Sequence, residues 1–183
     1  MIVQTVSDFR QTLWLEVTRA VRTQWSAVGE AERFWAVEKI EQLAELQQKL
    51  HSLVAAADGE ALCQKCLGGC CGDGLYHPTL VTILAHLIVD ESLPTPDFSR
   101  SCPYLGKAGC LFRPAVRPFN CIIFICEKIA VRCSDEQQLS LSRFEAEIRT
   151  IYEAFDHRYV GSSLRGLLNR PAGTDLLGLF SRR

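Results

Sequence analysis

All nine cysteines of this 183-residue chain lie between positions 63 and 133, and neither flank contains one. This cluster constrains the fold most, because thiols held close together become disulfides, metal ligands or redox groups. A secreted disulfide framework requires an even cysteine count, a leader peptide and a small chain. Here the count is odd, and the first residues lack a basic start followed by a long apolar run. We therefore expect reduced thiols in a cytoplasmic protein.

The first cysteines have the spacing of metal ligands. Cys63 and Cys66 form a Cys-x2-Cys pair, whose sulfurs can both reach one ion at about 2.3 Å. Redox dithiols share this spacing but typically follow a strand, whereas a predicted helix precedes this pair. Cys70 and Cys71 come next among glycines, which let the backbone wrap closely around a bound centre. Adjacent cysteines rarely bind the same small ion, so we expect one of the two to serve a second centre or to lie just outside the ligand set.

Four more cysteines follow in a proline-rich segment, namely Cys102, Cys110, Cys121 and Cys126. They make a second block of four, and four ligands satisfy one tetrahedral zinc ion or one 4Fe–4S cluster. Proline also follows a cysteine ligand in ferredoxin loops, so the proline directly after Cys102 slightly favours iron over zinc. Cys133 lies in an apolar segment, where we expect a core thiol. The sequence thus predicts eight ligands for an iron–sulfur cluster or zinc, and it leaves open the metal, the nuclearity and the grouping of the ligands.

The charges around the second block favour the same interpretation. The chain is nearly neutral, with 20 Lys and Arg against 21 Asp and Glu, which disfavours nucleic acid as a partner. Four thiolates around Zn²⁺ or a 4Fe–4S core leave a net charge of about −2. Arg117, shortly before Cys121, is the cation that we expect beside this centre, donating to sulfur or to carbonyl oxygens. A solvated surface arginine is the alternative.

Few other residues suggest chemistry. His77, in the glycine-rich turn after the first block, is the best-placed histidine for a ligand or proton carrier, although lone histidines more often cap or pack. Asp73 stands between two glycines and is first of all a turn former. The dinucleotide-binding, Walker A, zinc-protease and serine-hydrolase motifs are absent. Whether the chain is an enzyme stays open.

The flanks predict helices. We expect a helical hairpin over residues 1–60, a cysteine-cluster metal-binding region over 61–133, and C-terminal helices with a tail over 134–183, all in one compact domain. The fold class is mainly α, with helices packed around a loop-rich, cysteine-ligated metal centre. No segment is apolar enough to span a membrane.

Local signals predict where these helices begin and end. Ser7 is a plausible cap for the first helix, and Asp58-Gly59 ends the second with a left-handed glycine. Gln47 interrupts the second apolar stripe, which favours packing within the chain over a coiled-coil dimer. A helix over 78–91, with Pro78 in its first turn, forms a spacer between the cysteine blocks.

The C-terminal part has similar signals. Ser134 or Asp135 caps a helix that runs to about residue 160, and Ser163–Asn169 forms one more short helix. The tail then docks through an apolar set or stays loose. That set comprises Leu176, Leu177, Leu179 and Phe180.

The order of the cysteines resembles the YkgJ-type cysteine-cluster family, whose members are described as zinc- or iron-chelating proteins. The shared pattern covers about residues 63–126 and reads Cys63-x2-Cys66-x3-Cys70-Cys71, Cys102-Pro-x-Leu, Cys110, and Arg117-Pro118-x2-Cys121-x4-Cys126. The resemblance implies a metal site of eight cysteines and no particular reaction. A similar cluster in flagellin lysine methylases makes a radical or methyl-transfer enzyme an alternative.

Three functions follow from these observations. The first is a metal-binding protein in which the centre is structural, stored or handed on. The second is an enzyme whose iron–sulfur centre performs redox or methyl-transfer chemistry, and the third is an interaction module in which zinc holds the helices for a protein partner. Oligomeric state stays open, and neither a membrane nor a nucleic acid is an expected partner.

Overall fold

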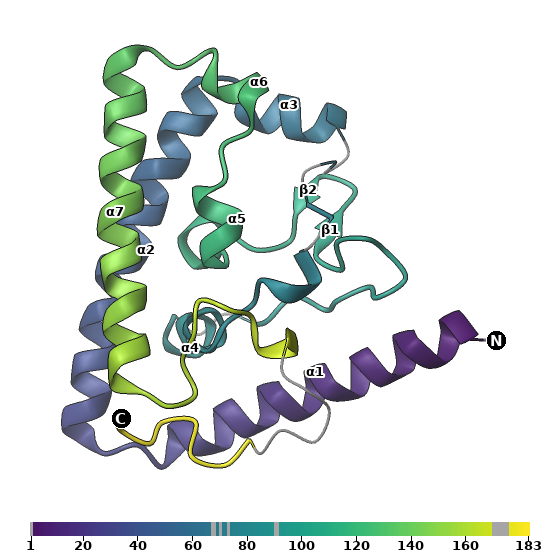
Figure 1. Cartoon of the computed structure of the whole chain (residues 1–183), viewed down its shortest axis with the longest axis vertical. Coiled ribbons are helices and arrows are strands. Elements are labelled where there is room, and N and C mark those ends of the chain that lie inside the picture. The colour runs from purple at the N-terminus through teal and green to yellow at the C-terminus, as the bar shows by residue number, and fades with distance from the viewer. Residues whose placement is uncertain (1, 67–68, 70, 73, 90–91, 170–175) are drawn as a thin grey trace.

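Two long helices, α2 (Glu30–Ala56) and α7 (Asp135–Arg158), run antiparallel side by side and frame the molecule (Figure 1). The computed structural model describes residues 2–66, 69, 71–72, 74–89, 92–169 and 176–183, without the side chains of residues 2–5. The described chain is mainly helical, which confirms the predicted fold class. The metal centre in that prediction stays a prediction.

Helix α7 begins where the sequence predicts. Gln137 N donates to Ser134 Oγ (3.3 Å) and Ser134 N donates to Gln137 Oε1 (2.8 Å), a reciprocal cap of the helix start. Apolar side chains of α7 and α2, including Ile148, Phe155 and Ile40, share one core. The second apolar stripe therefore packs within the chain, as expected.

Helix α1 (Ile2–Ser26) does not form the predicted hairpin with α2. It turns away from α2 at Gly29 and packs instead on α4 (Leu80–Ile88) and on the 3-10 turn η3 (Leu167–Asn169) (Figure 1). The reason is that α2 packs mainly against α7, whereas α4 is apolar on every side and contacts α1. The predicted cap at Ser7 is also wrong, because α1 begins five residues earlier.

Helix α4 is a central core helix rather than a spacer. All residues from Leu80 to His86 are buried, and a helix that is apolar on every side belongs in a core. Thr79 caps it, since Thr82 N donates to Thr79 Oγ1 (3.2 Å) and Thr79 N donates to Thr82 Oγ1 (3.1 Å). Pro78 therefore precedes the cap instead of occupying the first turn.

The turn after α2 also differs from the prediction. Asp58, with a φ of 60°, takes the left-handed conformation, and Gly59 opens the next helix, α3 (Gly59–Cys66). Position 59 needs a glycine because there is no room for a side chain: a Cβ there would lie 2.5 Å from Val54 Cγ1. After this close turn, α3 extends from the end of α2 on the side away from α7 (Figure 1).

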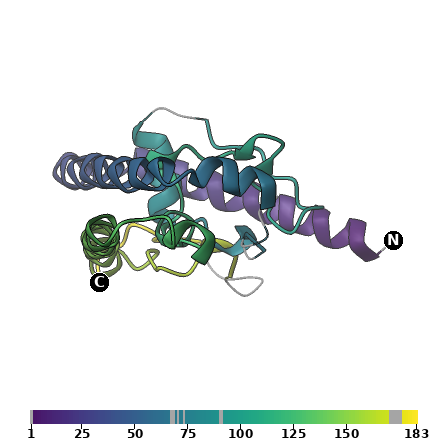
Figure 2. The same cartoon turned by 90° about the horizontal axis from the view of Figure 1, so that it is seen from above.

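Short elements connect α3 to α7. They are the 3-10 turn η1 (Gly74–Tyr76), the antiparallel strands β1 (Leu105–Gly106) and β2 (Gly109–Cys110), the 3-10 turn η2 (Pro114–Val116), and the helices α5 (Phe119–Ile123) and α6 (Glu127–Ala130). Both η2 and α5 pack on α2. Seen from above, α2 and α3 lie on one side of the molecule, and α7 with the C-terminal tail lies on the other (Figure 2).

The C-terminal tail docks, as predicted. Leu179 is buried, and the ring of Phe180 lies 5.6 Å from Trp25 and 5.3 Å from Tyr159. Gln24 holds the tail by accepting from Leu179 N (2.7 Å). Leu177 is 80% exposed, so its predicted part in docking is wrong. Ser163–Asn169 forms only the short turn η3.

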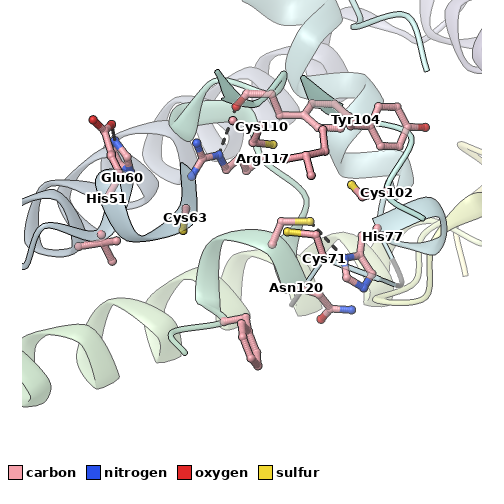
Figure 3. Close-up of a pocket in the computed structure, with 18 of the residues that line it drawn as sticks. His51, Glu60, Cys63, Cys71, His77, Cys102, Tyr104, Cys110, Arg117 and Asn120 are labelled. Carbon is pink, nitrogen blue, oxygen red and sulfur yellow. Dashed lines mark hydrogen bonds and ion pairs between the residues drawn. The ribbon is translucent and has the colours of Figure 1, made fainter. Parts of the chain in front are cut away.

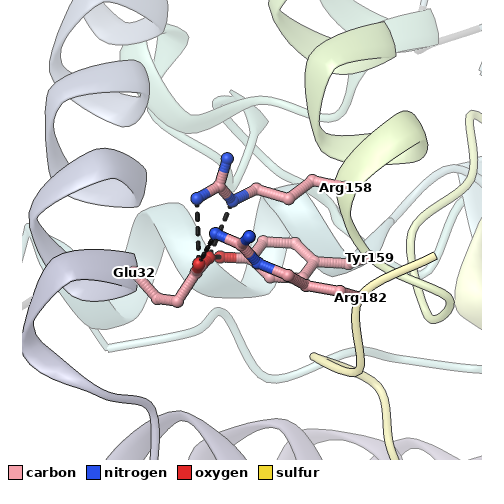
Figure 4. A network of polar contacts seen from close by, with 4 residues as sticks. All are labelled: Glu32, Arg158, Tyr159 and Arg182. Atoms are coloured by element: carbon pink, nitrogen blue, oxygen red, sulfur yellow. Dashed lines mark hydrogen bonds and ion pairs between the residues drawn. The ribbon is translucent and has the colours of Figure 1, made fainter.

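A network of ion pairs and hydrogen bonds around Glu32 links this tail to α2 and α7 (Figure 4). Glu32 of α2 accepts from Arg158 of α7 at 2.7 and 2.9 Å, from Tyr159 Oη at 3.0 Å, and from Arg182 of the tail. These donors, Arg158 first, lower the pKa of Glu32 from 4.5 to about 2 against the opposing effect of burial. In the part of the chain that is described, no helix is long and apolar enough to cross a membrane.

Candidate metal centre

Five of the predicted ligands open on one cavity of about 810 Å³ between α3, η1, the β1–β2 hairpin and α5 (Figure 3). They are Cys63, Cys71, Cys102, Cys110 and Cys121. The first two belong to the first sequence block and the other three to the second. The fold thus mixes the two blocks at a single cavity.

Two successive turns present Cys71 and His77 to this cavity. Gly74 N donates to Cys71 O (2.9 Å), and His77 N donates to Gly74 O (3.2 Å). Gly74 sits directly against Cys102, since a Cβ on it would collide with Cys102 Sγ. A glycine is therefore what allows the loop of Cys102 to approach the Cys71–His77 segment.

The hairpin presents Cys110 at the edge of the cavity. Gly109 has a φ of 117°, which suits glycine and lets the chain reverse, so that Cys110 pairs with Leu105. The preceding segment is held by Leu105 N, which donates to Cys102 O (3.2 Å). Cys102 is buried, whereas Cys110 is exposed. The cavity therefore has thiols both at its inner end and at its mouth.

Cys121 lies on α5, in the first turn after Pro118. Its Sγ is 3.1 Å from His77 Nδ1. Burial raises the pKa of the Cys121 thiol far above its usual range, and nearby thiolates at Cys110, Cys102 and Cys71 raise it further, while Arg117 opposes them. A bound cation reverses this preference, because metals bind the thiolate form.

Arg117 lies beside the thiols, as the sequence predicts. Its Nε donates to Phe112 O (3.2 Å), and its own carbonyl accepts from Gln47 Nε2 of α2 (3.0 Å). Its half-buried side chain lines the cavity, which differs from a solvated surface arginine. The fold therefore brings a fixed positive charge next to Cys121.

The remaining predicted ligands surround α3 or cannot be placed. Cys66 lies on α3, where its Sγ donates to Cys63 O (3.4 Å), and Cys126 caps α6. Helix α3 contacts both α6 and β2. Cys70 and Asp73 lie outside the described residues.

Cys133 packs in the core, as expected. It is 7% exposed, and its Sγ donates to Ile129 O at 3.6 Å, one helical turn earlier. Among the described residues, Cys133 is not part of the cavity lining. It is therefore set apart from the five cysteines that line the cavity.

A histidine that the sequence did not single out also lines the cavity. His51 Nε2 of α2 is 3.1 Å from Glu60 Oε1 of α3. Burial lowers the pKa of His51, Arg117 lowers it further, and Glu60 opposes both. The tight turn at Asp58 brings His51 and Glu60 together. No local sequence pattern predicts this contact, because it depends on that turn. His86 lies elsewhere in the core against Phe112, and burial lowers its pKa to about 4.

The thiols share a cavity without closing on a single point. Within the described ranges, no three or more His, Cys, Asp or Glu side chains are already arranged to hold a metal ion. The donor chemistry nevertheless fits soft or borderline metals, because thiolates and imidazole are the ligands that zinc and iron–sulfur centres use. The structure supports the proximity of the ligands, and metal binding stays a prediction.

No family model, curated protein or solved structure matches this chain. The resemblance to the YkgJ-type cysteine-cluster family therefore stays a prediction as well. Function has to be inferred from the residues of the cavity and their surroundings.

Proposed function

We propose that this chain binds a zinc or iron–sulfur centre through its clustered cysteines. The observation that carries the proposal is that five thiols from separate segments line one cavity of about 810 Å³. A free cysteine that serves only as a small apolar side chain is typically buried away from open space, as Cys133 is. Thiols gathered around an open space instead suit a thiophilic metal.

The electrostatics of the cavity support the same function. Deprotonated thiols repel one another here, because Cys121 lies near Cys71, Cys102 and Cys110, whose thiolates raise its pKa. A cation among them converts that repulsion into attraction. Arg117 offsets part of the remaining negative charge.

We propose two centres, each with its own group of ligands. The inner group consists of Cys71, Cys102 and Cys121 at the buried end of the cavity. The outer group consists of Cys63, Cys66, Cys110 and Cys126, carried by α3 itself or by elements next to it. Cys70 remains the eighth predicted ligand on its spacing alone. Such a protein belongs in a reducing compartment, so we propose the cytoplasm.

An iron–sulfur enzyme for redox or methyl-transfer chemistry is the second candidate. A zinc ion and its bonds reach only about 2.3 Å, enclosing a sphere of about 50 Å³. A cavity of about 810 Å³ leaves room for a small molecule, and pockets for such ligands measure about 300–1,000 Å³. A zinc-stabilised module for a protein partner is the third.

Anaerobic purification of the full chain tests these candidates. A colourless protein with about two zinc ions and no acid-labile sulfide supports zinc binding. A brown protein with iron and sulfide in equal amounts supports an iron–sulfur centre. The metal-binding proposal fails if the purified chain carries neither metal and takes up neither Zn²⁺ nor iron with sulfide.

A further inference from the structure

The imidazole of His77 lies at the inner end of the cavity, close to Cys71 and Cys102 (Figure 3). Its Nδ1 is 3.1 Å from Cys121 Sγ. In a tetrahedral zinc site, bonds of about 2.3 Å to sulfur and about 2.05 Å to nitrogen place those two atoms about 3.6 Å apart. His77 and Cys121 therefore need to separate by only about 0.5 Å to bind one ion between them.

The backbone ties His77 to the other two inner thiols. The successive turns from Cys71 through Gly74 hold Cys71 and His77 on one short segment. Cys102 Sγ lies directly against Gly74 in the middle of that segment. The three sulfurs and one nitrogen thus come from the Cys71–His77 segment and from two residues that contact it. Cys110 is also near Cys121, but it is exposed on the hairpin.

Charge also favours three sulfurs and one nitrogen over four sulfurs. Four thiolates around Zn²⁺ leave a charge of about −2, and three thiolates with a neutral imidazole leave about −1. Among the described residues that line the cavity, Arg117 is the one Lys or Arg, and Glu60 and Glu145 add negative charge. Because Glu60 and Glu145 already add negative charge, Arg117 compensates a larger share of the charge on a mixed site of about −1 than on a site of four thiolates of about −2.

We infer that His77 is a ligand, and that it binds the same metal as Cys71, Cys102 and Cys121. The inference rests on the proposed metal-binding function and specifies the inner centre. Coordination through Nδ1 places the ring proton on Nε2. The alternative role is a hydrogen bond from Nδ1–H to a Cys121 thiolate that binds metal without His77.

Two substitutions separate the ligand from the hydrogen-bond donor, with Co²⁺ as the probe on the metal-free full chain under anaerobic conditions. His77→Cys provides a thiolate that can ligate, so Co²⁺ affinity is kept while the ligand-field bands move to longer wavelength. His77→Asn keeps a donor N–H but is a poor ligand, so Co²⁺ affinity falls at least about tenfold. Circular dichroism establishes that both variants are folded.

His51→Asn is the matched control, since His51 lines the same cavity but contacts Glu60 instead of a thiol. Its cobalt spectrum should equal that of the wild type. The inference is overturned if His77→Cys leaves the bands in place, or if His77→Asn binds Co²⁺ as tightly as the wild type. In that case the proposed function still stands, provided that the double substitution Cys102→Ser, Cys121→Ser lowers the amount of Co²⁺ bound per chain. If the wild-type chain takes up no Co²⁺, the inference falls, and uptake of iron with sulfide then decides the proposed function.

Discussion

The helical frame and the cavity wall of this protein are built in opposite ways. The frame, α2, α4 and α7, consists of long or fully buried helices with a shared apolar core. The wall comprises the described residues of 63–77 and 102–126, which form short helices, 3-10 turns and a hairpin of two-residue strands, with several thiols half-buried or exposed. Short elements with little core of their own depend on neighbours and bound groups for their shape.

The frame supports the wall from behind. Gln47 of α2 is fully buried and donates to Arg117 O (3.0 Å). On α5, the ring of Phe119 lies 5.0 Å from that of Tyr152 and beneath the guanidinium of Arg149. Loss of the metal should therefore loosen the cavity side of the wall while the frame keeps its structure.

Removal of two inner ligands has the largest expected effect. The double substitution Cys102→Ser, Cys121→Ser should abolish metal binding at the inner centre, because it removes two of the four proposed inner ligands, while the outer centre keeps its cysteines. Elemental analysis measures the metal, and hydrogen exchange should show faster exchange in the wall than in α2 and α7. Cys133→Ser is the control and should retain all metal. An equal increase of hydrogen exchange in the frame and in the wall would contradict the view that only the wall depends on the metal.

A cavity in the frame should have the next largest effect. Leu84 of α4 is fully buried, so Leu84→Ala should lower the free energy of unfolding by about 3 kcal/mol. Because α4 contacts α1, α2 and η2, the loss should be global. Denaturant titration measures it, and Leu139→Ala, at a 72% exposed site on α7, should change little. A loss below about 1 kcal/mol would contradict the central place of α4.

The Glu32 network should make stability depend on acid. Because the folded-state pKa is lowered from 4.5 to about 2, this contribution is fully present above pH 4.5 and is lost as the pH falls towards 2. Glu32→Gln should lower the free energy of unfolding at pH 7 by about 2 kcal/mol. Thermal unfolding between pH 2 and pH 7 measures the profile, whose slope in the acid range should become shallower in the variant. Glu147→Gln, which removes a 3.8 Å exposed pair with Arg143, should leave it unchanged.

A methyl group in the wall should have the smallest effect on stability and a selective effect on metal. In Gly74→Ala the new Cβ meets Cys102 Sγ, so we expect metal affinity to fall about tenfold, or about 1.4 kcal/mol. Gly72→Ala is the matched control, because nothing lies within 4 Å of its added Cβ. Competition with a chelator measures both affinities. Equal affinity in the two variants would mean that Cys102 does not need its contact with Gly74.

The helices that the sequence predicts best are those with local signals. Ser134 marks the start of α7, as predicted, and the apolar residues of α2 pack within the chain, although on α7 and not on the predicted hairpin partner α1. The failures at Ser7 and Pro78, and the missing hairpin, depend on which surfaces meet after the chain folds back. A helix cap and the periodicity of apolar residues depend on residues close in sequence. The surface on which an apolar helix face packs depends on the whole fold.

The sequence by itself determined the number and order of the thiols, their suitability for zinc or iron–sulfur chemistry, and the cation at Arg117. Only the tertiary structure decided that Cys71, Cys102 and Cys121 line the same cavity and that His77 contacts Cys121. The reason is that residues can bind the same metal only if the fold brings them close together in space. Here that distance depends on α2 holding η2 and α5 against its side, and on a glycine small enough for two loops to touch.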